Sequence, residues 1–111
     1  MLAAMIETDR RASMRHPVDY PVLAGGVAGD GDVRLRIVNI STRGFMAHAD
    51  SRLAEGDRLM LTLPVIGRIE AFVLWTDGRR TGLAFERVVR LGDFTRMFVE
   101  MQPRRRLRER D

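Results

Sequence analysis

The sequence predicts an all-β domain, a six-stranded antiparallel β-barrel with a short C-terminal α-helix. Short segments in which apolar and polar residues alternate recur about every ten residues, as the strands of small barrels do. Turns containing Gly or Asp separate these segments, and a helical spacing of apolar residues begins only after Gly92. A barrel is favoured over an open sandwich because closure leaves no exposed strand edge.

The first two strands follow a proline-containing start. Pro17 and Pro21 disfavour a helix, and residues 20–23 predict a strand that ends at Gly25-Gly26. A turn at Asp30-Gly31 then precedes the clearest strand, because one of its faces is regularly apolar. In that strand Val33, Leu35 and Ile37 alternate with Arg34, Arg36 and Val38.

Four more strands complete the predicted barrel. They cover residues 45–47, 58–63, 68–75 and 83–85, and Asp77-Gly78 closes a hairpin between the last two. The longest of them is expected to turn one face to the core. The residues on that face are Ile69, Ala71, Val73 and Trp75.

A short amphipathic helix is predicted between Gly92 and Pro103, packed against one end of the barrel. Its apolar residues at helical spacing are Phe94, Met97, Phe98 and Met101. The chain therefore divides into an N-terminal arm (1–15), a barrel with its helix (16–102) and a basic tail (103–111). The arm is expected to be flexible and the tail disordered.

The composition limits the possible functions. A chain of 111 residues with 45% apolar and 31% charged residues is typical of one globular domain, and no apolar run is long enough to span a membrane. Without a signal peptide it is expected in the cytoplasm. It has no cysteine and only 2 histidines, so neither a thiolate nucleophile nor a metal site is expected. No motif of an enzyme is found.

The basic residues suggest an anionic ligand. All 19 are arginine and the net charge is +4. A guanidinium group can hold a phosphate or a guanine edge with paired hydrogen bonds, which lysine cannot do. A GC-rich genome is the alternative explanation for the absence of lysine.

Two polar clusters are candidates for a binding site. The first is Arg11-x-x-x-Arg15, preceded by Arg10, in a segment without an apolar face. The second, Asn39-Ile40-Ser41-Thr42-Arg43-Gly44, directly follows the clearest strand. Taken singly, the first is consistent with a solvated arm and the second with an ordinary turn whose glycine has a positive φ.

Together, these clusters resemble the PilZ domain family, whose signature is RxxxR followed further along the chain by [D/N]xSxxG. The resemblance continues through Gly56, Val73-Leu74-Trp75 and Gly82-Leu83-Ala84-Phe85. It implies a six-stranded barrel that binds cyclic di-GMP on its outer face, with the RxxxR arm over the ligand.

The chemistry of the two clusters suits that ligand. Arg11 and Arg15 can each hold a phosphate or the O6 and N7 acceptors of guanine. Asn39 and Ser41, two residues apart, are predicted to lie on the same face and accept hydrogen bonds from guanine N1 and N2. Gly44 allows a close approach of the backbone.

Four further residues are candidate ligand contacts. A basic residue before RxxxR accompanies two intercalated ligand molecules in the family, so Arg10 predicts an intercalated dimer. Arg43 could reach a phosphate. Trp75 could contact a guanine, although burial in the core is favoured, and His16 could line the pocket, although an ordinary surface position is favoured.

The resemblance implies a cyclic di-GMP receptor that changes conformation on binding and signals to an unidentified protein effector in trans. The alternative is a nucleotide-independent PilZ-like interaction module, but such relatives typically lack one or both motifs. An OB-like barrel for single-stranded nucleic acid would require more exposed aromatic residues. No cofactor, DNA, RNA or membrane partner is expected. The sequence does not indicate the pathway.

Overall fold

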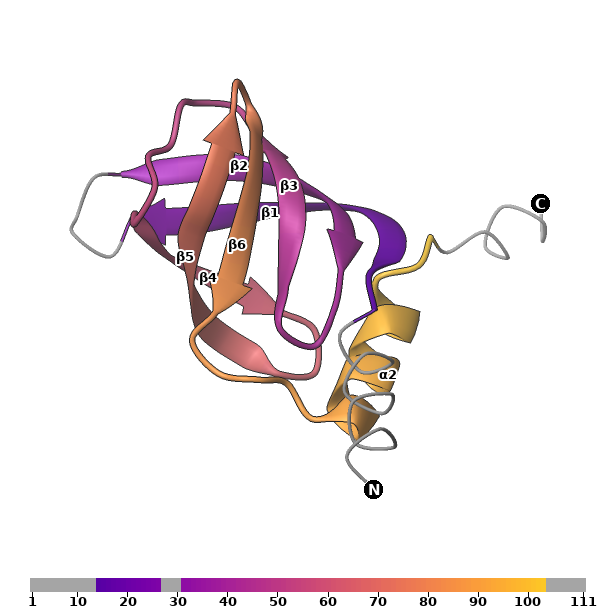
Figure 1. Cartoon of the computed structure of the whole chain (residues 1–111). Helices are drawn as coiled ribbons and strands as arrows, with labels where there is room; N and C mark the ends of the chain where they lie inside the picture. Colours follow the sequence, from indigo (N-terminus) through magenta and orange to yellow (C-terminus); the bar gives the residue numbers. More distant parts are fainter. Residues whose placement is uncertain (1–13, 27–30, 104–111) are drawn as a thin grey trace, which may run out of the picture.

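The computed structural model describes residues 14–26 and 31–103, which form a closed barrel and one helix (Figure 1). All neighbouring strands are antiparallel, in the order β1-β2-β3-β6-β5-β4, and β1 closes the barrel against β4. The predicted six-stranded barrel with a C-terminal helix is confirmed. Its elements are β1 (His16–Gly26), β2 (Asp32–Ile40), β3 (Gly44–Ala49), β4 (Arg58–Leu63), β5 (Gly67–Asp77), β6 (Arg80–Phe85) and α2 (Leu91–Glu100).

The interior is filled by the inward-facing residues of each strand. In β4, Leu59, Leu61 and Leu63 are buried, while the residues between them are exposed or half-buried. The rings of Phe45 and Phe85 lie 5.5 Å apart inside the barrel. The period of two in the sequence thus corresponds to the two sides of the barrel wall.

The first strand begins earlier than predicted. β1 starts at His16, which pairs with Ile40, and the pairing with β2 is irregular between Pro17 and Tyr20. Proline has no N–H to donate, and such irregularities are where a sheet tolerates it. Pro17 therefore lies within the strand and does not delay its start.

Helix α2 covers the end of the barrel where β1 begins (Figure 1). Phe94 and Met97 are buried, and so is Met101 directly after the helix, as its apolar spacing predicts. The imidazole of His16 lies 5.5 Å from the ring of Phe94 and 5.5 Å from that of Phe98. The start of β1 is thereby fixed against the helix.

The prediction that Trp75 belongs to the core is wrong. Ile69, Ala71 and Val73 are buried, but the pairing of β5 with β6 shifts between Val73 and Trp75. An extra residue at such a shift turns the following side chains to the opposite face. Trp75 is consequently 38% exposed on the outer wall.

Within the described residues, no helix is long and apolar enough to cross a membrane.

Candidate functional site on the outer wall

The barrel aligns four residues in a row across its outer wall. Asn39 on β2 pairs with Met46 on β3, Met46 pairs with Gly82 on β6, and Gly82 pairs with Trp75 on β5. Asn39 and Met46 are half-buried, and their inward-facing strand neighbours Ile40 and Phe45 are fully buried. We call Asn39, Met46, Gly82 and Trp75 the wall row.

Arg15 joins the first sequence motif to the second. Its Nη1 donates a hydrogen bond of 3.0 Å to Oδ1 of Asn39, 24 residues further along the chain. Arg15 is exposed, so a ligand can reach this guanidinium from solvent. One arginine of RxxxR and the first residue of the Asn39–Gly44 motif are therefore in contact at one end of the wall row.

Ser41 shapes the turn that follows Asn39. Its Oγ accepts a hydrogen bond of 3.1 Å from the N–H of Arg43 and lies 3.4 Å from the carbonyl oxygen of Gly44. Its own N–H donates to the Gly44 carbonyl at 2.8 Å, and the residue is only 3% exposed. Ser41 thus has a role within its own turn, and its predicted contact with guanine stays a prediction.

Gly44 is required by packing. A Cβ at this position would lie 2.1 Å from the carbonyl oxygen of Leu83 and 3.0 Å from Cα of Ala84. Its φ is not positive, in contrast to the turn glycines Gly31, Gly56, Gly67 and Gly78. The glycine therefore allows β3 to approach the backbone of β6, and an unusual turn conformation is not the reason for it.

The turn is also bonded to the last residue of β6 and to the chain that follows this strand. The carbonyl of Arg43 accepts a hydrogen bond of 2.8 Å from the N–H of Phe85, and the carbonyl of Thr42 accepts one of 2.8 Å from Val89. Thr42 is 1% exposed. The backbone of the motif is thus held on two sides, while the side chain of Arg43 is exposed.

Trp75 covers Gly82 at the other end of the wall row. A Cβ at Gly82 would lie 2.2 Å from Nε1 and 2.5 Å from Cε2 of the indole. The carbonyl of Trp75 accepts a hydrogen bond of 3.2 Å from Oγ1 of Thr81, which is 1% exposed. The missing side chain at Gly82 therefore lets the indole lie against the wall with part of its surface in solvent.

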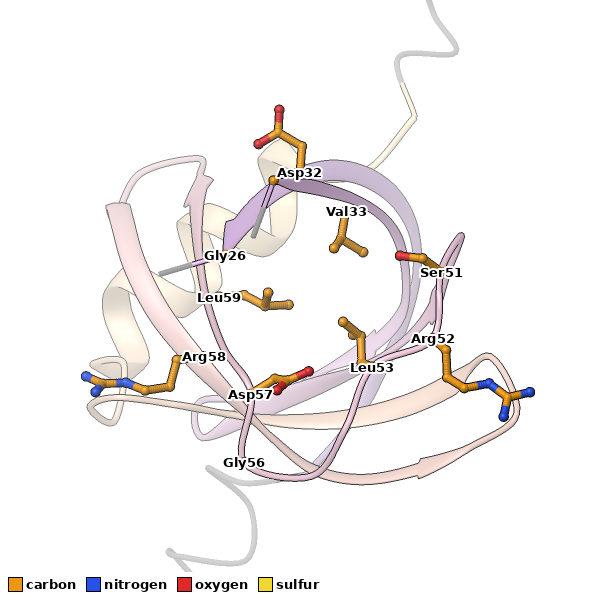
Figure 2. Close-up of a pocket in the computed structure, with 11 residues that line it drawn as sticks. Gly26, Asp32, Val33, Ser51, Arg52, Leu53, Gly56, Asp57, Arg58 and Leu59 are labelled. Carbon is orange, nitrogen blue, oxygen red and sulfur yellow. The ribbon is translucent and has the colours of Figure 1, made fainter. Parts of the chain in front are cut away.

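A separate cavity of about 470 Å³ lies at the end of the barrel away from α2 (Figure 2). Figure 2 shows Val33, Leu53 and Leu59 directed toward its centre, while the side chains of Arg52 and Arg58 point away from it. Arg58 is paired with Glu70 at 2.9 Å. None of the predicted site residues that the structure describes lines this cavity, and the side chains of its arginines are not directed into it.

The sequence profile described as "PilZ domain" matches residues 9–98, which is most of the chain. This chain belongs to the PilZ domain family. A search of curated proteins found no match. Among solved structures, the PilZ domain with c-di-GMP of YcgR from Escherichia coli is similar, with a TM-score of 0.54 and 19% identity. That similarity covers 91% of this chain and 96% of the other, and it shows a shared fold.

PilZ domains are non-catalytic c-di-GMP receptor domains, so family membership agrees with the expectation that the chain is not an enzyme. Within residues 14–26 and 31–103, no group of three or more His, Cys, Asp or Glu residues is placed to hold a metal ion.

Of the remaining predicted ligand contacts of this PilZ domain, the structure describes His16 but not the first two arginines. Arg10 and Arg11 lie outside the described residues. His16 is half-buried against two aromatic rings of α2, which is a packing role and not the surface position that was favoured.

A second row on the outer wall was not predicted from the sequence. Arg36 on β2 pairs with His48 on β3, which pairs with Arg80 on β6, and all three are exposed. Arg36 also forms an ion pair with Asp19. The alternation in β2 predicts that the side chain of Arg36 faces outward. Only the register of β2, β3 and β6 shows that Arg36 and Arg80 lie in the same row.

Proposed function

We propose that this PilZ domain binds cyclic di-GMP on its outer wall, across the wall row. The observation that supports this most is the 3.0 Å hydrogen bond between Arg15 and Asn39. It brings a guanidinium from the first motif and an amide from the second to one point on the surface. The similar Escherichia coli structure is that of a PilZ domain with c-di-GMP, which supports the same ligand for this chain.

The groups along the wall row match the chemistry of the ligand. Arg15 can donate two parallel hydrogen bonds to a phosphate or to O6 and N7 of guanine. The amide of Asn39 offers both a donor and an acceptor to the other guanine edge. The partly exposed indole of Trp75 offers a flat surface on which a base can stack, and stacking is worth about 1–3 kcal/mol per base.

Ligand binding would require Arg15 to exchange its partner. A solvent-exposed hydrogen bond of this kind contributes only about 0.5–1.5 kcal/mol, and a charge-assisted bond to phosphate is stronger. Since His16 is packed between the barrel and the aromatic rings of α2, movement of Arg15 acts on the residue that fixes the helix. This is the conformational change by which the domain would signal to a protein effector in trans.

Arg11 and Arg10 complete the proposed clamp. Arg11 is the other arginine of RxxxR, and Arg10 supplies a third guanidinium that suits the four phosphates of an intercalated dimer. On the barrel side, the ligand would be bound by the turn that contains Ser41, Arg43 and Gly44. Arg43 is exposed there, and Ser41 would act through the turn that it shapes. A receptor for this intracellular messenger would act in the cytoplasm.

Isothermal titration calorimetry with cyclic di-GMP, with GMP and cyclic AMP as controls, tests the proposal. Arg15→Ala and Arg11→Ala are each expected to reduce affinity at least tenfold and to leave the melting temperature within about 2 °C of wild type. Arg15 is exposed, and an exposed side chain contributes little to stability. Arg52→Ala, at the far end of the barrel, is the matched control and should bind normally.

Two outcomes would contradict this function. A flat trace for the wild type at high nucleotide concentration would favour a nucleotide-independent interaction module. Unfolding of Arg15→Ala would mean that the arginine is structural. The intercalated dimer requires two ligand molecules bound per chain of the wild type, and a value of one would reject it. If the wild type binds two, the Arg10→Leu variant should bind one.

A further inference from the structure

The turn between β4 and β5 holds a backbone conformation that its sequence does not favour. The N–H of Ile66 donates a hydrogen bond of 2.7 Å to the carbonyl of Pro64, which closes a three-residue turn around Val65. Val65 has a φ of 72°, and it is the one non-glycine residue with positive φ in the described part of the chain. A β-branched side chain is unfavourable there.

Burial does not compensate for this conformation. Val65 is 44% exposed, and Val88, in the chain between β6 and α2, is 55% exposed. Strained residues concentrate where a surface has a function. The turn therefore presents an apolar side chain to solvent in a fixed orientation.

The turn lines a groove together with the chain between β6 and α2. The groove has a volume of about 300 Å³, and it is lined by the turn residues Val65 and Ile66, the stretch 87–90 and Asp93. This volume lies at the lower limit of ligand pockets. A groove of this size can hold one side chain of a partner and the backbone next to it better than it can hold a whole small molecule.

The rim of the groove is basic. Arg87 forms an ion pair with Glu86 at 3.2 Å, and Asp93 forms one with Arg96 at 3.3 Å. The charges of these two groove residues are therefore largely balanced by their partners. Arg90 has no ion-pair partner among the described residues and is exposed. An exposed unpaired guanidinium beside an apolar groove complements a carboxylate next to an apolar side chain.

The groove is directly connected to the nucleotide motif. The N–H of Val89, in the groove wall, donates a hydrogen bond of 2.8 Å to the carbonyl of Thr42, and the N–H of Phe85 donates one of 2.8 Å to Arg43. A shift of the turn 41–44 must therefore move the stretch that forms one wall of the groove. The turn between β4 and β5, which forms one wall of the groove, lies at the α2 end of the barrel (Figure 1).

We propose that this groove is a docking site for a short acidic segment of a partner protein, which inserts one apolar side chain between Val65 and Val88 and pairs a carboxylate with Arg90. Docking itself is independent of the proposed function. Control of docking by cyclic di-GMP rests on that function.

The experiment uses the full chain, labelled with ¹⁵N, and an eight-residue synthetic peptide in which acidic residues surround two leucines. A peptide with lysine in place of each acidic residue is the control. Saturable shifts are expected for the amides of residues 65–67 and 86–93 with the acidic peptide only. Val88→Asp and Arg90→Glu should each raise the dissociation constant at least tenfold, whereas Arg52→Glu, at the other end of the barrel, should not.

Shifts confined to other surfaces, equal binding of both peptides, or unchanged affinity of the Arg90→Glu variant would overturn the proposal. Concentration-dependent shifts of the same amides without peptide would mean that a second copy of this chain occupies the groove, and would also overturn it. Repeating the titration with cyclic di-GMP separates the two proposals. Peptide binding without any nucleotide response leaves docking in place and rejects its control by the nucleotide.

Discussion

Replacing Gly44 by alanine adds one methyl group at a place where the barrel has no room for it. The Cβ would lie 2.1 Å from the carbonyl oxygen of Leu83 and 3.0 Å from Cα of Ala84. Both are backbone atoms, so the contact cannot be relieved by a change of rotamer. Gly44 pairs with Ala84, and the two strands must separate to accommodate the methyl group.

The expected loss of stability is large for such a small change. Overpacking commonly costs about 1–3 kcal/mol, and a contact with a fixed backbone belongs at or above the upper end, so we expect about 3 kcal/mol. For a domain of this size that corresponds to a melting temperature lower by roughly 12 °C or more. It is a substantial part of the roughly 5–15 kcal/mol of a typical domain.

Two other glycines provide matched controls in the same assay. The three atoms nearest to an alanine Cβ at Gly82 all belong to the Trp75 side chain, which is partly exposed and can move outward, so a loss of about 1 kcal/mol is expected. Gly92, in α2, has nothing within 4 Å of an added Cβ, and Gly92→Ala should stabilise by up to about 1 kcal/mol.

The assay is urea denaturation followed by circular dichroism, with thermal melts as a second measurement. The order of stability should be Gly92→Ala, wild type, Gly82→Ala and Gly44→Ala. If Gly44→Ala lies within about 0.5 kcal/mol of the wild type, the strand spacing inferred here is wrong, because surface substitutions alone produce changes of that size.

Further predictions concern the wall row and the α2 end of the barrel. Trp75 is the sole tryptophan, so cyclic di-GMP should change its fluorescence; no change at saturation, with binding verified by calorimetry, would place the ligand elsewhere. Asn39→Ala should weaken nucleotide binding by about 1–2 kcal/mol in calorimetry, and unaltered affinity would remove the amide from the site. His16→Ala loses its contacts with two rings of α2 and should lower stability by about 1–2 kcal/mol in urea, and a smaller loss would mean that these contacts are unimportant. Val65→Gly should raise stability by up to about 1 kcal/mol, and destabilisation would show that the turn is not strained.

Much of the candidate site was predictable because its residues are close in sequence. RxxxR and the motif 39–44 were recognisable as chain segments, and the alternation in β2 predicted which of its residues face outward. The roles inside the second motif were less predictable. Ser41 turned inward to shape its own turn, and the reason for Gly44 lies on β6, about forty residues away.

The sequence by itself determined the class of fold. Apolar alternation with a period of two, turn residues and one helical stripe specify the strands and the helix, because these patterns depend on neighbours along the chain. They also place Leu59, Leu61 and Leu63 in the core.

Only the tertiary structure decided which residues of different strands lie side by side. The row of Asn39, Met46, Gly82 and Trp75 depends on strand order and register, and the shift in pairing after Val73 turned Trp75 from the core to the surface. Register is set by closure and packing of the whole barrel, and a one-residue shift reverses the face of every following side chain. No local pattern in the sequence carries that information.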